Sequence, residues 1–337
     1  MVVDLETFQS LPTEEVARLV RESGPKVCVF PVNGTRRWLM LEYPDEVAAD
    51  FVDAYLRVVG QRMTELFKLF FDHGIDTLLS PLFGPDLLER EDEYLHLVAV
   101  GLSWFVRDQN CLDFYDAYDV RARVYGDAPR YLKSTSYTHL QSAFDELAQR
   151  TATHRRHRLF IGICAHDATE TVAEISVRYY QEHGHLPNKR QIVEAYYGEY
   201  VEPVDIFIGF DRPTVFDMPL VATGSEDLYF TVSPSPYLDA HILRAILYDH
   251  IYVRRVNEAS YAGLSAEDWQ VLADFYTLNR RRVLGLGCQS MNERFWYPLP
   301  QVELPPCLAE QSIIGPQLLR SSATTSRESG SKHNGAS

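Results

Sequence analysis

Cysteine and positive charge are both scarce in this sequence, and each shortage narrows the possible functions. The 337 residues include five cysteines, an odd number, widely spaced and without a Cys-x-x-Cys pair. This pattern gives neither a disulfide framework nor a cysteine-based zinc site. The formal net charge of −15 argues against a nucleic-acid-binding protein, which needs a basic face to neutralise phosphates, and equally against a protein held on anionic lipid.

Long apolar runs and several catalytic motifs are missing as well. No run approaches the roughly 18 residues that a membrane span requires, and the acidic N-terminus lacks the pattern of a signal peptide. We therefore expect a cytoplasmic protein with no stable membrane insertion. The sequence also has no Gly-x-x-x-x-Gly-Lys phosphate loop and no Gly-x-Ser-x-Gly nucleophile elbow.

Short apolar runs alternate with longer amphipathic patterns, which indicates an α/β fold with a mostly parallel central sheet flanked by helices. The predicted strands cover residues 26–30, 76–79, 120–125, 158–164, 204–208 and 228–232. The best-marked helix carries an apolar stripe at alternating spacings of four and three residues, made of Val52, Leu56, Val59, Met63, Leu66 and Phe70. Further helices are predicted at 14–22, 85–106, 136–149, 168–182, 189–196, 237–251 and 266–278.

A single domain over residues 1–305 is the simplest organisation, because nothing before Pro305 reads as a linker. The composition changes beyond that point, and residues 321–337 are rich in Ser, Thr and Gly with no hydrophobic period. We therefore predict that residues 306–337 form a disordered tail.

One loop combines features that suit an anion. Residues 33–38, Asn-Gly-Thr-Arg-Arg-Trp, follow the apolar run at 27–31, and ligands in open α/β sheets collect beyond the carboxyl ends of strands. Gly34 permits backbone conformations that bring amide N–H groups close to an anion. Arg36 and Arg37 add planar donors suited to phosphate oxygens. The alternative is that two adjacent arginines are an ordinary solvated pair.

The loop resembles the Asp-Gly-Asn-x-Arg-Trp signature that opens the cis-prenyltransferases, which have the fold of undecaprenyl diphosphate synthase. Later segments follow in the same order. Arg-Val-Tyr-Gly-Asp at 123–127 resembles the Arg-Val-Ile-Gly-Asp strand of that family, and Asp-Leu-Tyr-Phe-Thr at 227–231 resembles its Glu-Leu-Tyr-Phe-Thr. The segment from 244 to 255, which ends in an arginine pair, resembles its C-terminal helix.

A closer resemblance is to a divergent branch, the tuberculosinol/isotuberculosinol synthases, also described as tuberculosinyl adenosine transferases and similar to kolavelool synthase. It rests on the opening run from 24 to 38 and on His-Gly-Ile at 73–75. The other shared runs are Tyr-Tyr-Gly-Glu-Tyr-Val at 196–201, Asp-Ile-Phe-Ile-Gly-Phe at 205–210, Leu-Tyr-Asp-His-Ile-Tyr at 247–252 and Gly-Leu-Gly-Cys at 285–288.

That resemblance implies a magnesium-dependent, homodimeric enzyme that ionises a bicyclic diterpenyl diphosphate and no longer elongates a chain. The family's diphosphate site is lined by the arginine pair and two tyrosines, which by spacing fall on Tyr55 and Tyr94. Gly34, Thr35 and Trp38 would contact the substrate.

Two further observations agree with this picture. Elongating relatives hold a second diphosphate with an Arg-x-Gly-x-x-Arg-x-Ser run, whereas residues 208–214 read Ile-Gly-Phe-Asp-Arg-Pro-Thr and keep only Arg212, which we predict to bind the substrate. One basic group would neutralise a second polyanion poorly. The sequence also lacks the Asp-x-Asp-Asp of protonation-initiated cyclases, so any ring system must arrive already formed.

Two positions bear on the metal and on proton transfer. Asn33 stands where both families carry Asp; it can offer a neutral oxygen to Mg²⁺ but cannot accept a proton near neutral pH. Asp227 stands where elongating enzymes place a metal-binding Glu. We therefore predict Asn33 and Asp227 as magnesium ligands, with Asp227 as a surface residue at a strand start being the alternative.

Three functions are left open by these residues. The first is a diterpene synthase in which water captures the cation and an alcohol is released. The second is a diterpenyl transferase that uses adenosine or another nucleophile. The third is a non-catalytic partner subunit, since some cis-prenyltransferase relatives lose their active-site Asp. Retention of Arg36, Arg37, Trp38 and the tyrosines argues against the third function.

Overall fold

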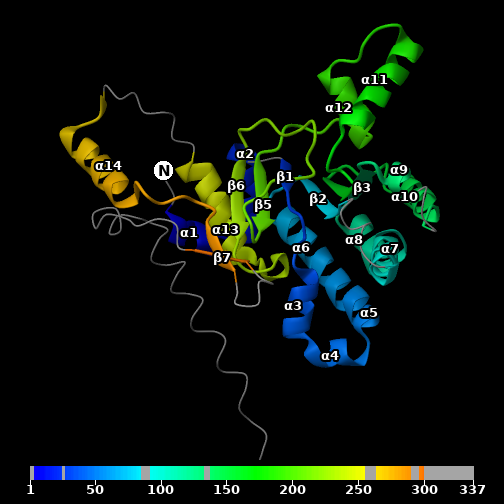
Figure 1. Cartoon of the computed structure of the whole chain (residues 1–337), viewed down its shortest axis with the longest axis horizontal. Helices are drawn as coiled ribbons and strands as arrows, with labels where there is room; N and C mark the ends of the chain where they lie inside the picture. The colour runs from blue at the N-terminus through cyan, green and yellow to red at the C-terminus, as the bar shows by residue number, and fades with distance from the viewer. Residues whose placement is uncertain are drawn as a thin grey trace, which may run out of the picture. The chain divides into compact units, whose positions relative to one another are not determined.

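The computed structural model describes residues 4–24, 27–84, 92–132, 137–254, 263–289 and 296–299 (Figure 1). The chain divides into two compact units, Pro12–Leu247, and Met1–Leu11 with Tyr248–Ser337. The single domain expected over residues 1–305 spans both units and stays a prediction. The tail expected at 306–337 lies outside the described residues.

The larger unit is built on a six-stranded sheet in the order β3-β4-β2-β1-β5-β6, and every neighbouring pair of strands is parallel. The α/β class with a mostly parallel sheet is therefore confirmed. The strands are β1 (Val27–Val29), β2 (Thr77–Phe83), β3 (Val120–Tyr125), β4 (His157–Ile163), β5 (Ile206–Phe210) and β6 (Asp227–Thr231).

Helices make up much of the rest of the described chain, and those of the larger unit connect its strands (Figure 1). In chain order they are α1 (Leu5–Ser10), α2 (Thr13–Ser23), α3 (Thr35–Glu42), α4 (Pro44–Ala49), α5 (Phe51–Ala54), the π-helix η1 (Tyr55–Val59), α6 (Gly60–Asp72), α7 (Asp92–Arg107), α8 (Gln109–Ala117), α9 (Ala128–Leu132), α10 (His139–Arg150), α11 (Thr169–His183), α12 (Lys189–Tyr197), the 3₁₀-helix η3 (Ser235–Tyr237), α13 (Ala240–Tyr248), the π-helix η4 (Asp249–Val253) and α14 (Ala266–Asn279). None of the helices in the described ranges combines the length and apolarity needed to cross a bilayer.

The smaller unit includes α1, η4 and α14, together with a two-stranded antiparallel sheet of β7 (Gly287–Gln289) and β8 (Trp296–Pro298). Its aromatic contacts join two segments that are distant in the sequence, since the Phe8 ring packs against Tyr248 and Tyr252 at centroid distances of 5.7 and 6.0 Å. These contacts hold α1 to the segment around η4.

The central strand β1 is fully buried, and the segment that follows it lies in the middle of the sheet's carboxyl edge. All three residues of β1 are buried, and β1 lies between β2 and β5 in the sheet. Parallel strands that are covered on both faces are expected to be apolar throughout. Because all six strands run the same way, their carboxyl ends share one edge, and the segment after β1 lies at its centre.

Two helical features differ from the prediction. The segment expected to be a loop through Trp38 turns helical at Thr35, because Gly34 adopts a left-handed conformation (φ 76°) and serves as the N-cap of α3. The apolar stripe predicted as one helix is split into α5, η1 and α6. Its first residue, Val52, is 43% exposed, whereas Val59 and the three later stripe residues are buried.

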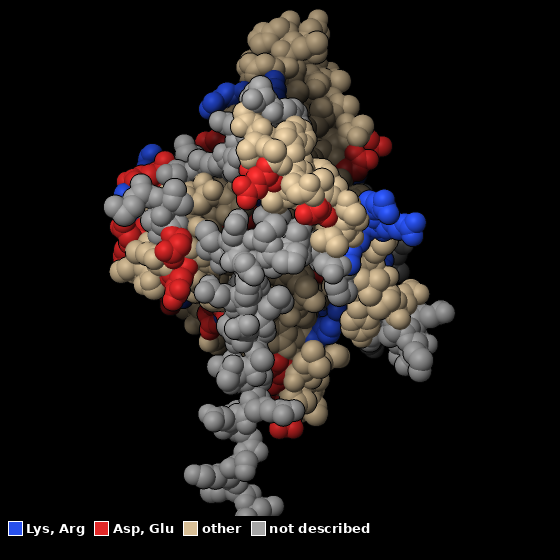
Figure 2. Space-filling model, turned by 90° about the vertical axis from the view of Figure 1, so that its left-hand side faces the viewer, with Lys and Arg blue, Asp and Glu red and all other residues tan. Residues whose placement is uncertain are grey.

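The chain carries an excess of negative charge. Acidic residues outnumber basic ones, 47 to 32, and on the face shown in Figure 2 acidic side chains are scattered over several elements. An anionic ligand therefore depends on local groups of arginines rather than on a general positive field.

Candidate active site

The segment after β1 makes a tight turn that ends in a helix N-terminus. Val29 ends β1, Gly34 takes the left-handed φ of 76°, and Thr35 is the first residue of α3. The first helical hydrogen bond runs from the Trp38 N–H to the Gly34 carbonyl oxygen, at 2.9 Å. The positive end of a helix dipole thus lies at the carboxyl edge of the sheet, which favours an anion there.

Gly34 is required by packing as well as by backbone conformation. A Cβ atom at this position would lie 2.9 Å from the Phe210 ring and 2.9 Å from the Cβ of Pro234. Carbon atoms do not approach this closely without displacement of a neighbour. The turn is therefore pressed against the ends of β5 and of the segment that follows β6.

A buried serine fixes the turn from the other side. The Ser235 hydroxyl accepts the Asn33 N–H at 3.1 Å and donates to the Pro31 carbonyl oxygen at 3.2 Å. The Ser235 N–H donates to the Asn33 carbonyl oxygen at 3.0 Å. Arg62 on α6 holds this segment in turn, because it donates to the carbonyl oxygens of Pro236 and Leu238, both at 2.9 Å.

The far end of α3 is held by the same segment. The Tyr237 hydroxyl donates to the Glu42 carboxylate. Burial raises the pKa of Tyr237 to about 12, and the hydrogen bond to Glu42 acts in the same direction. Tyr237 is therefore a neutral donor at physiological pH, so both ends of α3 are tied to the chain that follows β6.

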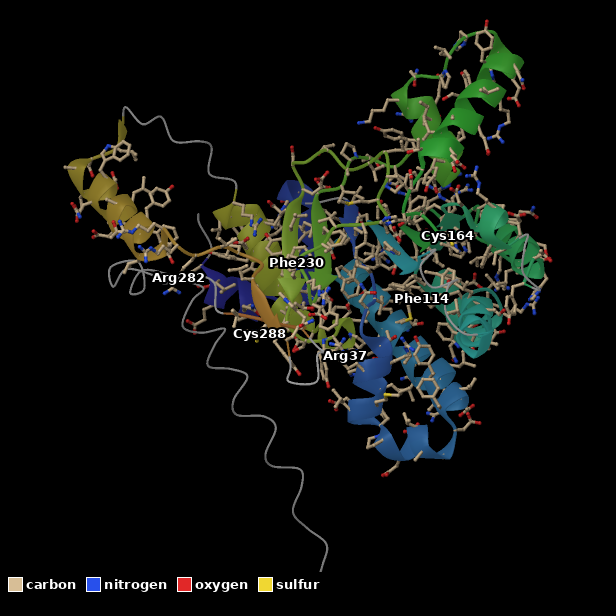
Figure 3. The ribbon with its side chains drawn as sticks, in the orientation of Figure 1. Arg37, Phe114, Cys164, Phe230, Arg282 and Cys288 are labelled. Atoms are coloured by element: carbon tan, nitrogen blue, oxygen red, sulfur yellow. The ribbon has the colours of Figure 1, made fainter. Side chains whose placement is uncertain are left out.

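Arg37 lies at the carboxyl edge with its guanidinium held in place (Figure 3). Its Nη1 is 3.8 Å from the Asp211 carboxylate, and its Cζ lies 5.4 Å from the centroid of the Phe210 ring. The Arg37 side chain is 43% exposed and that of Asp211 25% exposed. Arg36, one residue earlier on α3, is exposed. The pair is thus accessible to a ligand.

Of the two predicted tyrosines, the structure brings Tyr55 to the loop. The Tyr55 hydroxyl and the Thr35 hydroxyl are 2.8 Å apart. Tyr55 begins the π-helix η1, and π-helical turns frequently mark functional sites. Tyr94 falls within the backbone range of α7, and its side chain lies outside the described residues.

Two further residues predicted to bind the substrate, Trp38 and Arg212, differ in burial. Trp38 is 6% exposed and packs edge-on against Tyr43 at 5.4 Å, so it supports α3 from inside. Arg212 follows β5 directly and is exposed at the same edge as the loop.

The predicted pairing of Asn33 with Asp227 at one metal ion is not formed within the chain. Asp227 opens β6 and is in register with Ile206, which in turn is in register with Cys28. Asn33 lies five residues beyond Cys28 in the direction of the strands, past the opposite end of the sheet. Asp227 starts its strand whereas Asn33 follows the end of another, so the structure places these two predicted ligands at opposite ends of the sheet.

Asp211 is the carboxylate at this edge that sequence reasoning missed. It follows β5, takes a left-handed φ of 70°, and its N–H donates to the Thr231 carbonyl oxygen at 3.1 Å. The signal was present, because Asp211 directly follows an apolar run and precedes Arg212. The sequence prediction used Arg212 from this pattern and left Asp211 out.

The side chains at the carboxyl edge could supply only part of the ligand set of a magnesium ion, so substrate phosphates and waters would have to complete it. Within the described residues, no group of three or more His, Cys, Asp or Glu side chains could hold a metal. Mg²⁺ is often bound through one or two carboxylates together with substrate phosphates and waters. Asp211 and the amide oxygen of Asn33 are the donors here that suit such a partial set.

Comparison with known proteins first defines the fold. The chain is similar to the crystal structure of lavandulyl diphosphate synthase from Lavandula x intermedia in complex with dimethylallyl diphosphate, with a TM-score of 0.54 and 14% identity over 71% of this chain and 97% of that one. This likeness shows a cis-prenyltransferase-like fold. No family model matches the chain.

Sequence relatives then define the family. The chain is 40% identical to tuberculosinyl adenosine transferase of Mycobacterium tuberculosis over 298 residues, 88% of this chain and 98% of that protein. It is also 25% identical to (+)-kolavelool synthase of Herpetosiphon aurantiacus over 288 residues, 83% of this chain and 91% of that protein. The chain therefore belongs to the tuberculosinyl adenosine transferase family and is an enzyme.

Proposed function

We propose that this enzyme ionises a bicyclic diterpenyl diphosphate of the halimane or clerodane type and that water captures the resulting cation. The products are a diterpene alcohol and diphosphate. The observation that carries the proposal is the arrangement after β1, where a glycine turn, the N-terminus of α3, an arginine pair and the Tyr55 hydroxyl converge. The names of the two sequence relatives support the choice of a diterpenyl substrate.

The diphosphate is bound by Arg36 and Arg37 at the N-terminus of α3. Guanidinium groups donate in parallel pairs to phosphate oxygens, and the helix dipole adds to their attraction. Charge develops on the departing diphosphate as the C–O bond breaks, so donors placed at this end stabilise the transition state more than the ground state. The Phe210 ring and Asp211 keep Arg37 in position for this task.

The proton balance does not require a strong base on the loop. The electron pair of the broken C–O bond leaves with diphosphate, and a water oxygen forms the new C–O bond. The oxonium ion that results is strongly acidic, and the departing diphosphate accepts its proton. Asn33, which cannot accept a proton, is compatible with this route, and Asp211 is a carboxylate at the same edge.

Magnesium is proposed as the cofactor that neutralises diphosphate charge when bound. Asn33 and Asp211 would hold it together with the diphosphate oxygens. Asp227 has no part in this set, because it lies at the other end of the sheet. A homodimer is proposed from family resemblance, and a cytoplasmic location is proposed from the sequence.

The second candidate function is transfer of the diterpenyl group to adenosine. It is favoured by the name of the 40% identical relative, and it shares the ionisation step. In this reaction a nucleophilic atom of adenosine replaces water and forms the new bond to carbon while the C–O electron pair leaves with diphosphate. A hydroxyl or amino nucleophile would pass its proton to the diphosphate, whereas a ring nitrogen has no proton to lose and would give a cationic product. A non-catalytic partner subunit, the third candidate from the sequence, does not agree with a chain that belongs to a family of enzymes, and the converging site also argues against it.

One experiment separates the three candidates. The purified enzyme is incubated with Mg²⁺ and halimadienyl, kolavenyl or geranylgeranyl diphosphate, with and without adenosine, and the products are analysed by mass spectrometry. A diterpene alcohol formed without adenosine supports the synthase. An adenosine adduct in place of the alcohol supports the transferase, and unchanged substrates throughout would contradict an enzymatic role.

A further inference from the structure

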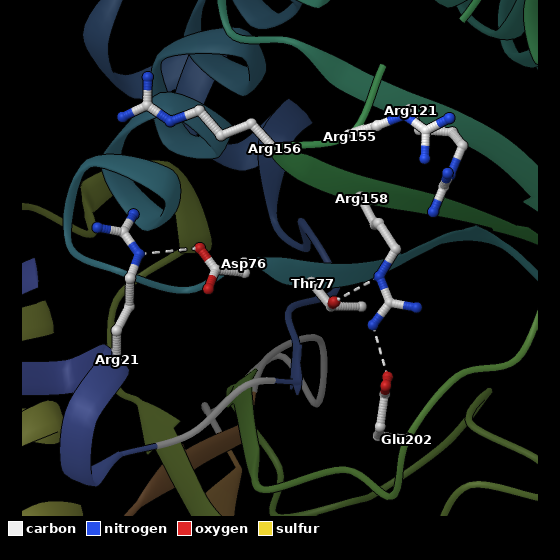
Figure 4. Close-up of a pocket in the computed structure, with 8 residues that line it drawn as sticks. All are labelled: Arg21, Asp76, Thr77, Arg121, Arg155, Arg156, Arg158 and Glu202. Carbon is white, nitrogen blue, oxygen red and sulfur yellow. Dashed lines mark hydrogen bonds and ion pairs between the residues drawn. The ribbon is translucent and has the colours of Figure 1, made fainter. Parts of the chain in front are cut away.

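A second group of arginines surrounds a cavity at the amino edge of the sheet, opposite the loop (Figure 4). The cavity has a volume of about 460 Å³. Five arginines line it: Arg21, Arg121, Arg155, Arg156 and Arg158. The other lining residues are Asp76, Thr77 and Glu202. Every lining side chain is therefore charged or polar.

The sheet itself brings two of these arginines together. Thr77 on β2 and Arg121 on β3 are both in register with Arg158 on β4. Side chains in register on neighbouring strands point to the same face. The cavity therefore lies where three parallel strands begin, and like charges are placed side by side there.

Carboxylates neutralise part of this charge. Arg158 donates to the Thr77 hydroxyl at 2.9 Å and to the Glu202 carboxylate at 2.5 Å, and Arg21 donates to Asp76 at 3.1 Å (Figure 4). Arg121 pairs at 2.6 Å with Glu199, which is not among the lining residues. These pairs explain three of the five arginines as part of a structural network.

Arg155 and Arg156 are not explained by that network. Both are exposed, and in the described part of the chain neither side chain makes a hydrogen bond or an ion pair. Their backbone N–H groups donate to the Asp119 carboxylate, at 3.1 and 2.9 Å. Asp119 itself takes a left-handed φ of 51°. The turn thus carries two consecutive arginines at the cavity, and their side chains extend to opposite sides of it, that of Arg155 toward Arg121 (Figure 4).

We propose that this cavity is a second anion-binding site, specific for a compact polyphosphate such as inorganic diphosphate. Five arginines against two carboxylates leave three net positive charges on the lining. A phosphate group carries about 1.5 to 2 negative charges at neutral pH, so roughly two linked groups match the lining. Among the described residues, no aromatic side chain lines the cavity, so it offers a nucleobase no ring to stack on. The site is separate from the proposed diphosphate loop.

The test counts binding sites in the full-length chain. Inorganic diphosphate is titrated calorimetrically, without Mg²⁺, into the unmodified chain, the Arg155→Gln/Arg156→Gln chain and the Arg37→Ala chain. We expect two sites per chain in the first, and loss or at least tenfold weakening of a different site in each variant. Two unchanged sites in the Arg155→Gln/Arg156→Gln chain would overturn the proposal. Two unchanged sites in the Arg37→Ala chain would instead count against the proposed function.

Matched controls remove the remaining explanations. Arg150→Gln/Arg178→Gln makes the same charge change at two exposed arginines outside the cavity and should leave both sites unchanged. At the cavity, inorganic phosphate should bind at least tenfold more weakly than diphosphate, and ATP should bind no more tightly than inorganic triphosphate. Equal binding of phosphate, or tighter binding of ATP, would contradict a site for a compact polyphosphate.

Discussion

The two edges of the central sheet both carry arginines, and they present them differently. At the carboxyl edge, Arg36 and Arg37 stand on the first turn of α3, directly after a left-handed glycine. At the amino edge, Arg121 and Arg158 stand on neighbouring strands and are paired with carboxylates. The comparison teaches that the number of arginines alone does not distinguish the edge that we propose to bind the substrate. The carboxyl edge is distinguished by backbone geometry and by the Tyr55 hydroxyl.

The largest expected effect tests the carboxyl edge directly. Arg37→Ala should lower kcat/KM by about a thousandfold, because it removes a donor that stabilises charge on the departing diphosphate. The fold should survive, since the side chain is partly exposed. Turnover is measured with the substrate identified above. Arg178→Ala on α11 is the control, and rates within threefold of each other in the two variants would refute the site assignment.

At the amino edge, we expect a group whose titration makes the free energy of unfolding depend on pH. His157 is 1% exposed and stacks on Phe71 at 4.4 Å. Burial lowers its pKa from 6.5 to about 4. Between these values the unfolded chain binds a proton that the folded chain does not, so the free energy of unfolding should fall by up to about 3 kcal/mol as pH drops from 6.5 toward 4.

Urea unfolding at about pH 7 and about pH 5 measures this loss of stability. His157→Phe should reduce the pH dependence, whereas His183→Gln, which changes an exposed histidine on α11, should not. The pKa of His73 is also lowered by burial, so part of the dependence should persist in the first variant. An unchanged dependence in His157→Phe would show that His157 does not contribute.

A comparison of Gly34 with a second glycine separates the effect of steric crowding on stability from the effect of backbone strain. Gly34 and Gly184 have nearly the same φ, 76° and 75°, but a Cβ at Gly184 meets no atom within 4 Å. Gly34→Ala should therefore cost about 2 kcal/mol more stability than Gly184→Ala, because only the first must displace the Phe210 ring. Thermal or urea unfolding of both variants measures the difference. Equal losses would mean that backbone strain alone explains Gly34.

Substitution of one aspartate at each edge of the sheet compares the two edges by their effect on kcat/KM. Asp211→Asn should lower kcat/KM about tenfold, since it removes the charge that holds Arg37 in place. Asp227→Asn should change it less than twofold, because Asp227 lies at the amino edge. The two variants are compared with the same substrate. A larger effect from Asp227 would restore the original metal-ligand prediction and contradict the edge assignment.

The smallest expected effect concerns the hydroxyl pair. Tyr55→Phe and Thr35→Val each break the 2.8 Å hydrogen bond and should each lower kcat/KM about threefold to tenfold. Because both changes remove the same interaction, the double variant should be little worse than either single variant. Fully additive losses would show that the two hydroxyls act independently.

Much of this fold could be predicted from the sequence, because its strands are short apolar runs bounded by turn residues. β3 was expected at 120–125, where it lies. The position of the loop could also be predicted, since an apolar strand followed by glycine and two arginines is a local pattern. The start of α3 at Thr35 could not, because the glycine that caps it reads locally as an ordinary turn.

The remaining features depend on contacts between distant parts of the chain. The pairing of Arg37 with Asp211 requires β1 and β5 to be neighbours, which no local pattern specifies. The cavity at the amino edge collects arginines from residues 21, 121 and 155–158, and only the order of the strands brings them together. The placement of Asn33 and Asp227 at opposite ends of the sheet also depends on strand order and direction, because a motif identifies a strand but not its neighbours.

The π-helical turn Tyr55–Val59 makes chain length a determinant of catalysis. Each residue of a helix turns the next by about 100°. Val59, Met63 and Leu66 are buried in the core and fix the rotation of α6, so a change of one residue within the turn must be absorbed on its N-terminal side. The Tyr55 hydroxyl would then swing away from Thr35, and the buried Ala54 beside it would lose its packing. At the proposed diphosphate site, an insertion or deletion within this turn would therefore redirect a hydroxyl as effectively as a substitution.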